Sequence, residues 1–233
     1  MKLKIVTFNV QHFLNYITQQ IDMDMFERVI RSFDADVIGL NEVYGAGYWG
    51  DQVTEMGRRL GYHAYFAQAI NVGEEGLYGN GLLSRHPMVN ARTILVPNPD
   101  QNGYDGFYET RCLLQADIDV PGGLQVNVIH MGLNPDEQEN AVITVAEHVS
   151  ARRSILMGDF NMTPDDVNLV PIQAFMQDAA ALFDEAEKPS FPSDAPDIKI
   201  DYIFTSEDIK CLSADIPEII ASDHRPHIAT VER

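Results

Sequence analysis

Apolar residues recur along the chain with two spacings, one typical of helices and one typical of strands. Ile21, Met25 and Val29 recur at helical spacing. The predicted helices cover residues 18–33, 52–60 and 134–149 and the stretch after Pro164. Short apolar runs predict strands over residues 3–9, 36–42, 63–67, 81–84, 89–96, 107–120, 124–130, 154–158, 200–205, 210–216 and 227–231.

The order of these elements favours an α/β sandwich, because the helices are inserted between runs of strands. A sheet of strictly alternating βαβ units is the weaker alternative. No repeat and no linker interrupts the 233 residues, so we expect one domain over residues 1–233. Cys112 and Cys211 lie in strand-like apolar runs without metal-ligand spacing, and we expect them to be buried free thiols.

Charge narrows the range of partners. The chain has 35 acidic residues against 16 Lys and Arg, a net charge of −19, so its mean field repels polyanions. A local group of acids that binds Mg²⁺ could still accept a phosphate. No apolar run approaches the roughly 20 residues that span a bilayer, so we expect no stable membrane insertion and a cytoplasmic location.

Polar residues of unusual type fall where several apolar strands end, and strand ends are where sites are assembled. Asn9, Glu42 and His130 each end a predicted strand, and Asp159 and Asn161 follow another. Each residue alone is compatible with an ordinary role as a strand cap or a turn residue. Together they predict a site at one edge of the sheets.

Asp201 differs from these residues because it interrupts the apolar run from Ile200 to Phe204, where an unpaired acid would be costly to bury. His224 is the candidate partner, since a hydrogen bond from histidine to aspartate orients the ring for proton transfer. Glu109 has two open interpretations, a site acid or a strand residue paired with Arg111.

Six blocks in chain order resemble the endonuclease/exonuclease/phosphatase superfamily, and the resemblance spans nearly the whole chain. They are Thr7-Phe8-Asn9, Leu40-Asn41-Glu42, Gly79-Asn80-Gly81-Leu82-Leu83-Ser84-Arg85, Gly158-Asp159-Phe160-Asn161, Ile200-Asp201-Tyr202-Ile203-Phe204 and Ser222-Asp223-His224-Arg225-Pro226. The resemblance implies a four-layer αββα sandwich like that of deoxyribonuclease I, with two packed mixed β-sheets flanked by helices. It also implies Mg²⁺-dependent phosphoester hydrolysis, with Mn²⁺ as the alternative ion.

The resemblance also implies residue roles. The implied metal group is Glu42 as principal ligand with Asn9, Asp223 and Asp159. The implied catalytic group is His224 paired with Asp201, Asp159 and Asn161 at the water and phosphate, and His130 supported by Glu109. His224 or Asp159 is the implied base. Gln11 stands where the family often has an acid or a histidine, and a neutral amide adds no charge there.

The substrate is harder to predict from the sequence. Loops 44–52 and 98–107 carry no Lys or Arg, which disfavours nucleic acid. The aromatic residues of these loops could form a rim for a small or lipid-like substrate, or simply pack the loops, which we favour; they are Tyr44, Tyr48, Trp49, Tyr104 and Phe107. Arg111 is a candidate phosphate contact, with ion pairing to a neighbouring acid as the ordinary alternative.

We therefore expect a phosphodiesterase or phosphatase that acts on a small or lipid-derived phosphoester. The segment from His130 to Asn134 resembles the small bacterial phosphodiesterase-like branch of the superfamily. A metal-dependent deoxyribonuclease is one alternative, and a catalytically silent binding or scaffold protein is another. No protein partner is indicated.

Overall fold

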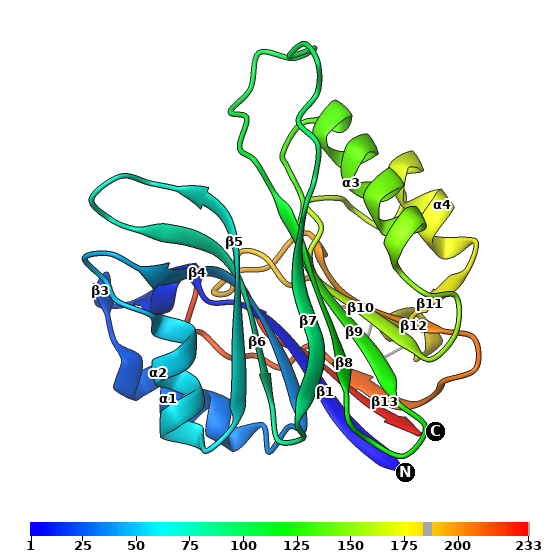
Figure 1. Cartoon of the computed structure of the whole chain (residues 1–233), viewed down its shortest axis with the longest axis horizontal. Coiled ribbons are helices and arrows are strands. Elements are labelled where there is room, and N and C mark those ends of the chain that lie inside the picture. Colours follow the sequence, from blue (N-terminus) through cyan, green and yellow to red (C-terminus); the bar gives the residue numbers. More distant parts are fainter. Residues whose placement is uncertain (184–187, 233) are drawn as a thin grey trace.

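Two six-stranded β-sheets lie face to face in the computed structural model, which describes residues 1–183 and 188–232 (Figure 1). The first sheet has the strand order β13-β14-β1-β4-β6-β5. Its strands are β1 (Lys2–Asn9), β4 (Val37–Ala46), β5 (His63–Asn71), β6 (Leu77–Ser84), β13 (Lys210–Asp215) and β14 (His227–Glu232).

The second sheet has the strand order β11-β12-β10-β9-β8-β7. Its strands are β7 (Met88–Leu95), β8 (Cys112–Ile118), β9 (Leu124–His130), β10 (Ser154–Asp159), β11 (Met176–Asp178) and β12 (Asp201–Ser206). Both sheets are mixed, since β1 runs parallel to β4 and β9 runs parallel to β10 among antiparallel pairs.

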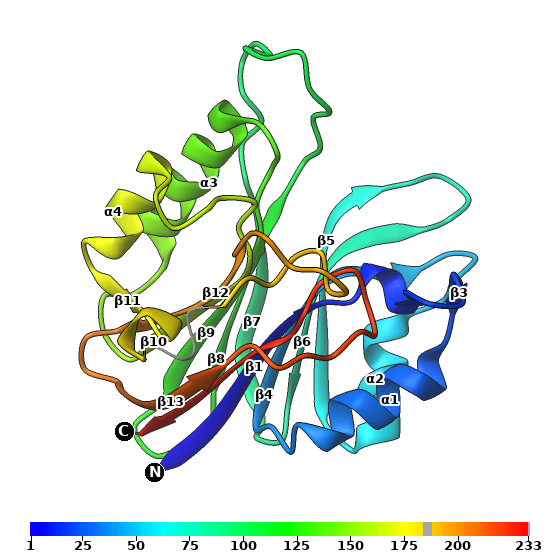
Figure 2. The same ribbon diagram turned by 180° about the vertical axis from the view of Figure 1, so that it is seen from behind.

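Helices cover the outer faces of both sheets (Figure 2). The first sheet carries α1 (Met23–Ser32) and α2 (Gln52–Leu60), and the second carries α3 (Pro135–His148) and the short α4 (Val170–Gln173). Three 3₁₀ turns cover Gln11–Phe13, Val167–Leu169 and Ala180–Leu182, and β2 (Leu14–Asn15) pairs with β3 (Gln20–Ile21). The predicted four-layer sandwich is therefore confirmed.

Three hydrophobic cores separate the four layers, because successive side chains of a strand point to opposite faces. In β1, Leu3 and Ile5 belong to the core between the sheets, while Val6 and Phe8 pack under α1 and α2. The third core lies between the second sheet and α3. Strands that are buried on both faces read as continuous apolar runs, which is why the sequence indicates them clearly.

The predicted helix over residues 18–33 was too long at its start. Helix α1 begins at Met23, because the Asp22 side chain accepts a hydrogen bond from the Met25 backbone N–H at 2.8 Å and caps it there. The β2–β3 hairpin occupies the preceding residues. The stretch after Pro164 forms a 3₁₀ turn and four residues of α-helix.

The predicted strand over residues 107–120 was also too long, since β8 begins at Cys112. In the segment before β8, Tyr108 and Glu109 bond to α3 instead of to a neighbouring strand. The Tyr108 hydroxyl donates to Asp136 at 2.8 Å, and the Glu109 backbone N–H donates to the Glu137 carboxylate at 3.1 Å. Conversely, the strand predicted over 36–42 continues to Ala46, with bulges after Leu40.

Both cysteines are free, as expected, but only Cys112 is buried and Cys211 is half-buried. None of the helices in the described part of the chain is long and apolar enough to cross a membrane.

Candidate active site

The parallel strands place the candidate residues at one edge of both sheets. In the first sheet, Asn9 at the end of β1 lies level with Asn41 of β4. In the second, Asp159 at the end of β10 lies between His130 of β9 and Asp201 of β12. Strand register alone therefore aligns residues that lie far apart in the sequence.

Asn41 joins the two sheets at this edge, a role that the sequence did not reveal. Its amide nitrogen donates to Asn80 Oδ1 at 2.8 Å and to the Ile129 carbonyl at 2.9 Å, and its oxygen accepts from the Asp159 backbone N–H at 2.9 Å. The side chain is completely buried. Because Asn41 belongs to the first sheet and binds the backbone of β9 and β10 in the second, it sets the position of Asp159 relative to the first sheet.

His224 and Asp201 form a buried hydrogen-bonded pair. His224 Nδ1 lies 2.8 Å from Asp201 Oδ2, and the Phe191 ring packs against the imidazole with centroids 4.8 Å apart. Burial by itself would lower the pKa of His224, but the carboxylates of Asp201 and Asp159 raise it to about 10. The structure thus gives Asp201 the partner that its position in an apolar strand requires.

Asp159 lies at the centre of the site. Its Oδ2 accepts from Asn9 Nδ2 at 3.1 Å and lies 3.5 Å from His130 Nε2 and 3.6 Å from His224 Nε2. Its Oδ1 accepts from the Asn161 backbone N–H at 2.9 Å. Burial raises the pKa of Asp159, while the nearby His224 acts in the opposite direction.

His130 has a different neighbour from the one that the resemblance implied. Arg111 lies between it and Glu109: the guanidinium is 2.9 Å from Glu109 Oε1 and 3.1 Å from His130 Nδ1. Glu109 therefore supports Arg111, and its contact with His130 is indirect. Since a guanidinium only donates, Nδ1 is the unprotonated ring nitrogen, and burial together with Arg111 holds the pKa of His130 well below its usual range.

Asn161 also lies against His130. Its amide nitrogen is 3.3 Å from His130 Nε2 and donates to the Met131 carbonyl at 3.0 Å. Among the predicted catalytic residues, the structure thus brings His224, Asp201, Asp159, Asn161 and His130 together, with Glu109 one residue further out.

Glu42 occupies the side of the site formed by the first sheet. Its carboxylate accepts from Asn9 Nδ2 at 2.9 Å and from the Tyr78 hydroxyl at 2.8 Å. Tyr78 is a site residue that sequence reasoning missed, although it directly precedes the Gly79–Arg85 block. Asp223 is half-buried, and burial raises its pKa, with Glu42 adding to the rise and His224 opposing it.

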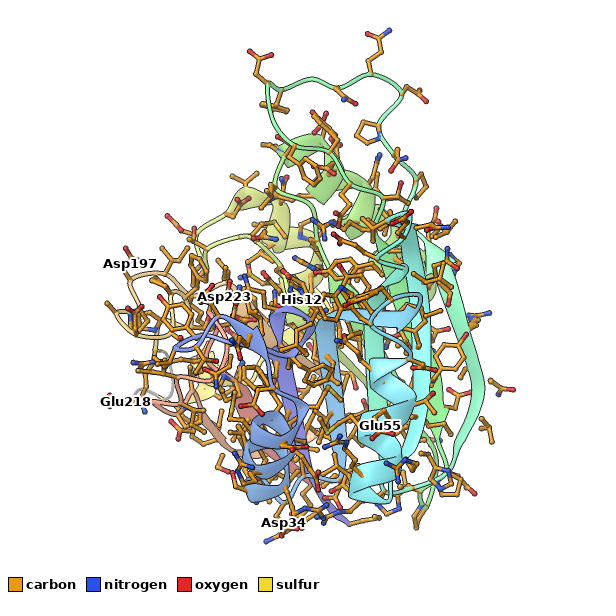
Figure 3. The ribbon with its side chains drawn as sticks, turned by 90° about the vertical axis from the view of Figure 1, so that its left-hand side faces the viewer. His12, Asp34, Glu55, Asp197, Glu218 and Asp223 are labelled. Carbon is orange, nitrogen blue, oxygen red and sulfur yellow. The ribbon has the colours of Figure 1, made fainter. Side chains whose placement is uncertain are left out.

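Strained backbone accompanies the site on both of its sides. Gln11, His12 and Phe13 have positive φ angles of 43°, 48° and 63°, and Glu42 and Asn161 have φ of 58° and 52°. Such angles are unfavourable for residues other than glycine and concentrate at functional sites. The turn at Gln11–Phe13 brings His12 close enough to Glu42 and Asp223 for both to act on its pKa, although burial lowers it overall. His12 and Asp223 are labelled in Figure 3.

Gln11 donates its backbone N–H to Asn9 Oδ1 at 3.1 Å, so at this position the backbone holds Asn9 in place. The strained turn is held from α2, because the buried Gln52 donates to the His12 carbonyl at 2.9 Å.

A pocket of about 490 Å³ opens over these residues. Its polar wall is formed by Glu42, Tyr78, Glu109, Arg111, His130, Asp159, Asn161, Thr163 and His224. Its apolar wall is formed by Phe107, Leu133, Phe191, Ile198 and Ile200. Of the aromatic residues predicted as a rim, Phe107 lines this pocket, whereas Tyr44, Tyr48, Trp49 and Tyr104 do not. Trp49 instead packs edge-on against Tyr48 at 4.8 Å between centroids, and Tyr104 is 51% exposed.

The site offers two groups of potential metal ligands. Asp159, Asp201 and His224 place ligand atoms within 4.8 Å of one another. His224 Nδ1 and Asp201 Oδ2 are already engaged in their mutual hydrogen bond, however. Glu42 and Asp223 supply carboxylate oxygens on the other side, and oxygen-rich donor sets suit hard divalent cations. The donors therefore fit Mg²⁺ or Mn²⁺ better than zinc.

Sequence comparison adds independent evidence. Residues 6–224 match the profile of the endonuclease/exonuclease/phosphatase family. The Escherichia coli K12 protein YbhP is 23% identical over 252 residues, an alignment that covers 98% of this chain and 95% of YbhP.

Solved structures share the fold. A protein described as an endonuclease/exonuclease/phosphatase from Beutenbergia cavernae superposes with a TM-score of 0.84 at 26% identity, covering 99% of this chain and 71% of that one. The mannosyl-6-phosphatase of Bacteroides thetaiotaomicron gives a TM-score of 0.80 at 15% identity, covering 99% and 100% of the two chains.

Proposed function

The chain belongs to the endonuclease/exonuclease/phosphatase family, a family of phosphoester hydrolases, and we propose that its pocket hydrolyses a small phosphoester with Mg²⁺ bound beside Glu42. The observation that carries this proposal is the position of Asp159. Its carboxylate lies within 3.6 Å of His224 and is tied through Asn9 to Glu42, so proton-transfer and cation-binding groups meet in one pocket.

His224 and Asp159 handle the proton of the attacking water. Asp201 engages Nδ1 of His224, so Nε2 is the nitrogen that can exchange a proton with the pocket. Because Nε2 and Asp159 Oδ2 are 3.6 Å apart, a water at this place reaches both. Because the pKa of His224 is raised to about 10, its ring is already an imidazolium near pH 7, so Asp159 accepts the water proton and His224 neutralises charge on the phosphoryl group.

Glu42 and Asp223, with Asn9 beside them and Asp159 at the boundary, would hold the cation. When bound, Mg²⁺ supplies Lewis-acid polarisation of a phosphoryl oxygen. Asn9 orients both Glu42 and Asp159 through its amide nitrogen, and the Tyr78 hydroxyl holds the second oxygen of Glu42. Burial raises the pKa of Asp223 and of Asp159, which shows that their charged forms are unfavourable in this site. A bound cation would stabilise both carboxylates in their charged form.

His130 and Asn161 take the opposite side of the phosphoryl group. Asn161 offers amide hydrogens beside His130, and Arg111 brings a guanidinium to the wall of the same pocket. Arg111 is paired with Glu109, so its charge is largely compensated, and it orients His130. These donors favour a phosphoryl group with developing negative charge.

The apolar wall supports a small or lipid-derived ester over a polynucleotide. Arg111 is the only Lys or Arg among the described residues that line the pocket, whereas nucleic-acid sites collect many. Phe107 and Leu133 line the pocket yet remain 66% and 57% exposed. An aryl or acyl group beside the phosphoester would cover them, which favours such a substrate.

A hydrolysis panel tests the reaction. It sets an aryl phosphodiester, an aryl phosphomonoester, a phospholipid and plasmid DNA against the protein with Mg²⁺, Mn²⁺ or a chelator. We expect metal-dependent turnover that falls at least about 100-fold in Glu42→Ala and in His224→Ala. His63→Ala and Glu139→Ala are matched controls, because both residues are exposed and lie outside the pocket.

Two outcomes would contradict this proposal. Turnover that survives in both site variants would place the chemistry elsewhere, and nicking of plasmid DNA in preference to the small esters would favour a nuclease. The apolar wall has its own test, because Phe107→Ala should raise KM for the aryl ester. Tyr104→Ala, in the same loop but outside the pocket, should leave KM unchanged.

A further inference from the structure

A group of buried polar atoms without hydrogen-bond partners lies behind the His224–Asp201 pair. Asp201 uses Oδ2 for His224, but its Oδ1 has no partner in the described part of the chain. Within residues 1–183 and 188–232, the same holds for both ring nitrogens of His227 and for Thr7 Oγ1. All three residues are completely buried.

The strand pairing places these residues on facing sides of the gap between the sheets. Thr7 of β1 lies directly opposite His227 of β14 in the first sheet. His227 shares its face of β14 with Ala229, which belongs to the core between the sheets, and Asp201 shares its face of β12 with Ile203 of the same core. The ring of His227 therefore faces Asp201 from the opposite sheet.

The protonation state of His227 fits a hydrogen-bonding role. Burial lowers its pKa to about 4, while Asp178, Asp201 and the main chain of Asp201 act in the opposite direction and Lys199 adds to the lowering. The ring is neutral near pH 7, so one nitrogen donates and the other accepts. Isolated buried donors and acceptors of this kind are usually satisfied by an ordered internal water.

We propose that His227 is a positioning residue: together with Thr7 it holds one buried water against Oδ1 of Asp201, and this water fixes the carboxylate that orients His224. The role in catalysis rests on the proposed function. With Oδ1 held from behind, the Asp201 carboxylate cannot rotate, and Oδ2 stays in line with His224 Nδ1. Without that restraint the imidazole samples orientations in which Nε2 no longer faces Asp159.

The test replaces His227 in two ways. His227→Val removes both ring nitrogens, and His227→Gln keeps a donor and an acceptor. We expect His227→Val to lower kcat roughly ten-fold with KM little changed, and His227→Gln to recover most of the loss. His63→Val is the matched control, since His63 is an exposed histidine of the same sheet.

Proton NMR gives a readout that needs no turnover. The His224 Nδ1 proton, held by Asp201, should give a low-field resonance in the wild type that broadens in His227→Val and returns in His227→Gln. Wild-type kcat and an unchanged resonance in His227→Val would overturn the proposal. Equal losses in both variants would also overturn it, because they would indicate a packing role alone.

A wild-type measurement covers the case in which His227→Val fails to fold. Long-range ¹H–¹⁵N spectra should show His227 as one neutral tautomer with a slowly exchanging ring proton, and a ring that averages between tautomers would refute the role. If the wild-type protein hydrolyses no ester of the panel but shows the low-field His224 resonance and the single His227 tautomer, the proposed function is refuted. The buried water between His227 and Asp201 would then still stand.

Discussion

Replacing Asn41 by leucine should separate the geometry of the site from the stability of the fold. The substitution keeps a similar volume but removes three hydrogen bonds, to Asn80, to the Ile129 carbonyl and from the Asp159 backbone N–H. All three partners lie in the closed gap between the sheets, so water cannot readily replace the lost bonds. Each one left unsatisfied costs about 1–3 kcal/mol.

The expected loss of stability is roughly 4 kcal/mol, after allowing for the apolar surface that leucine contributes. For a domain of this size that corresponds to a fall in Tm of about 10 °C. The kcat of the folded Asn41→Leu protein should also fall, which a loss of stability alone would not cause. The Asp159 backbone loses its anchor, and a displacement of catalytic groups by about 1 Å costs on the order of 100-fold in kcat.

Asn127→Leu is the matched control for this experiment. Asn127 is equally buried and also makes three bonds, to Ile155, Gln125 and Gln115, but these lie away from the pocket. Urea denaturation of both variants should give similar losses of stability. Steady-state kinetics on the preferred ester, measured well below either midpoint, should show a kcat within about two-fold of wild type for Asn127→Leu only.

Equal kcat values in the two variants would refute the claim that Asn41 positions Asp159. A loss below about 1 kcal/mol in Asn41→Leu would refute the claim that this side chain ties the sheets together.

Three further predictions concern stability and metal binding. The pKa of His227 falls from 6.5 to about 4 on folding, so between these pH values the unfolded state binds a proton on His227 that the folded state does not. The free energy of unfolding should therefore drop by roughly 3 kcal/mol as the pH falls from 6.5 to 4. Urea titrations of His227→Gln at these pH values should lack this contribution. Gly158→Ala places a Cβ 1.8 Å from the Ile129 carbonyl at a φ of +145°, so it should lose more than about 3 kcal/mol in chemical denaturation, against about 1 kcal/mol for Gly61→Ala, where the Cβ meets nothing within 4 Å. Tyr78→Phe removes the hydroxyl that holds Glu42, and the Mg²⁺ concentration for half-maximal activity should rise about ten-fold.

Local chemistry determined much of the secondary structure before any tertiary contact was known. The start of α3 follows from Asn134, the proline after it and Glu137, which together form a capping box. The end of α2 follows from Gly61, which adopts φ +74° as the left-handed C-cap. The strand predicted over 107–120 was wrong at its start because Tyr108 and Glu109 bond to α3, and hydrophobic patterning carries no record of such a partner.

The sequence by itself also determined which residues gather at the site, because so many polar side chains at the ends of buried strands exceed what turns and strand caps require. What only the tertiary structure decided is how they are connected. Asn9 reaches Asp159 across 150 positions of sequence and Asn41 reaches the Asp159 backbone across 118, while Arg111 takes the place beside His130 that was expected for Glu109. Hydrophobic periodicity reports which face of a strand is buried, but the partner on the facing sheet depends on how the two sheets stack, and that is set by the whole core at once.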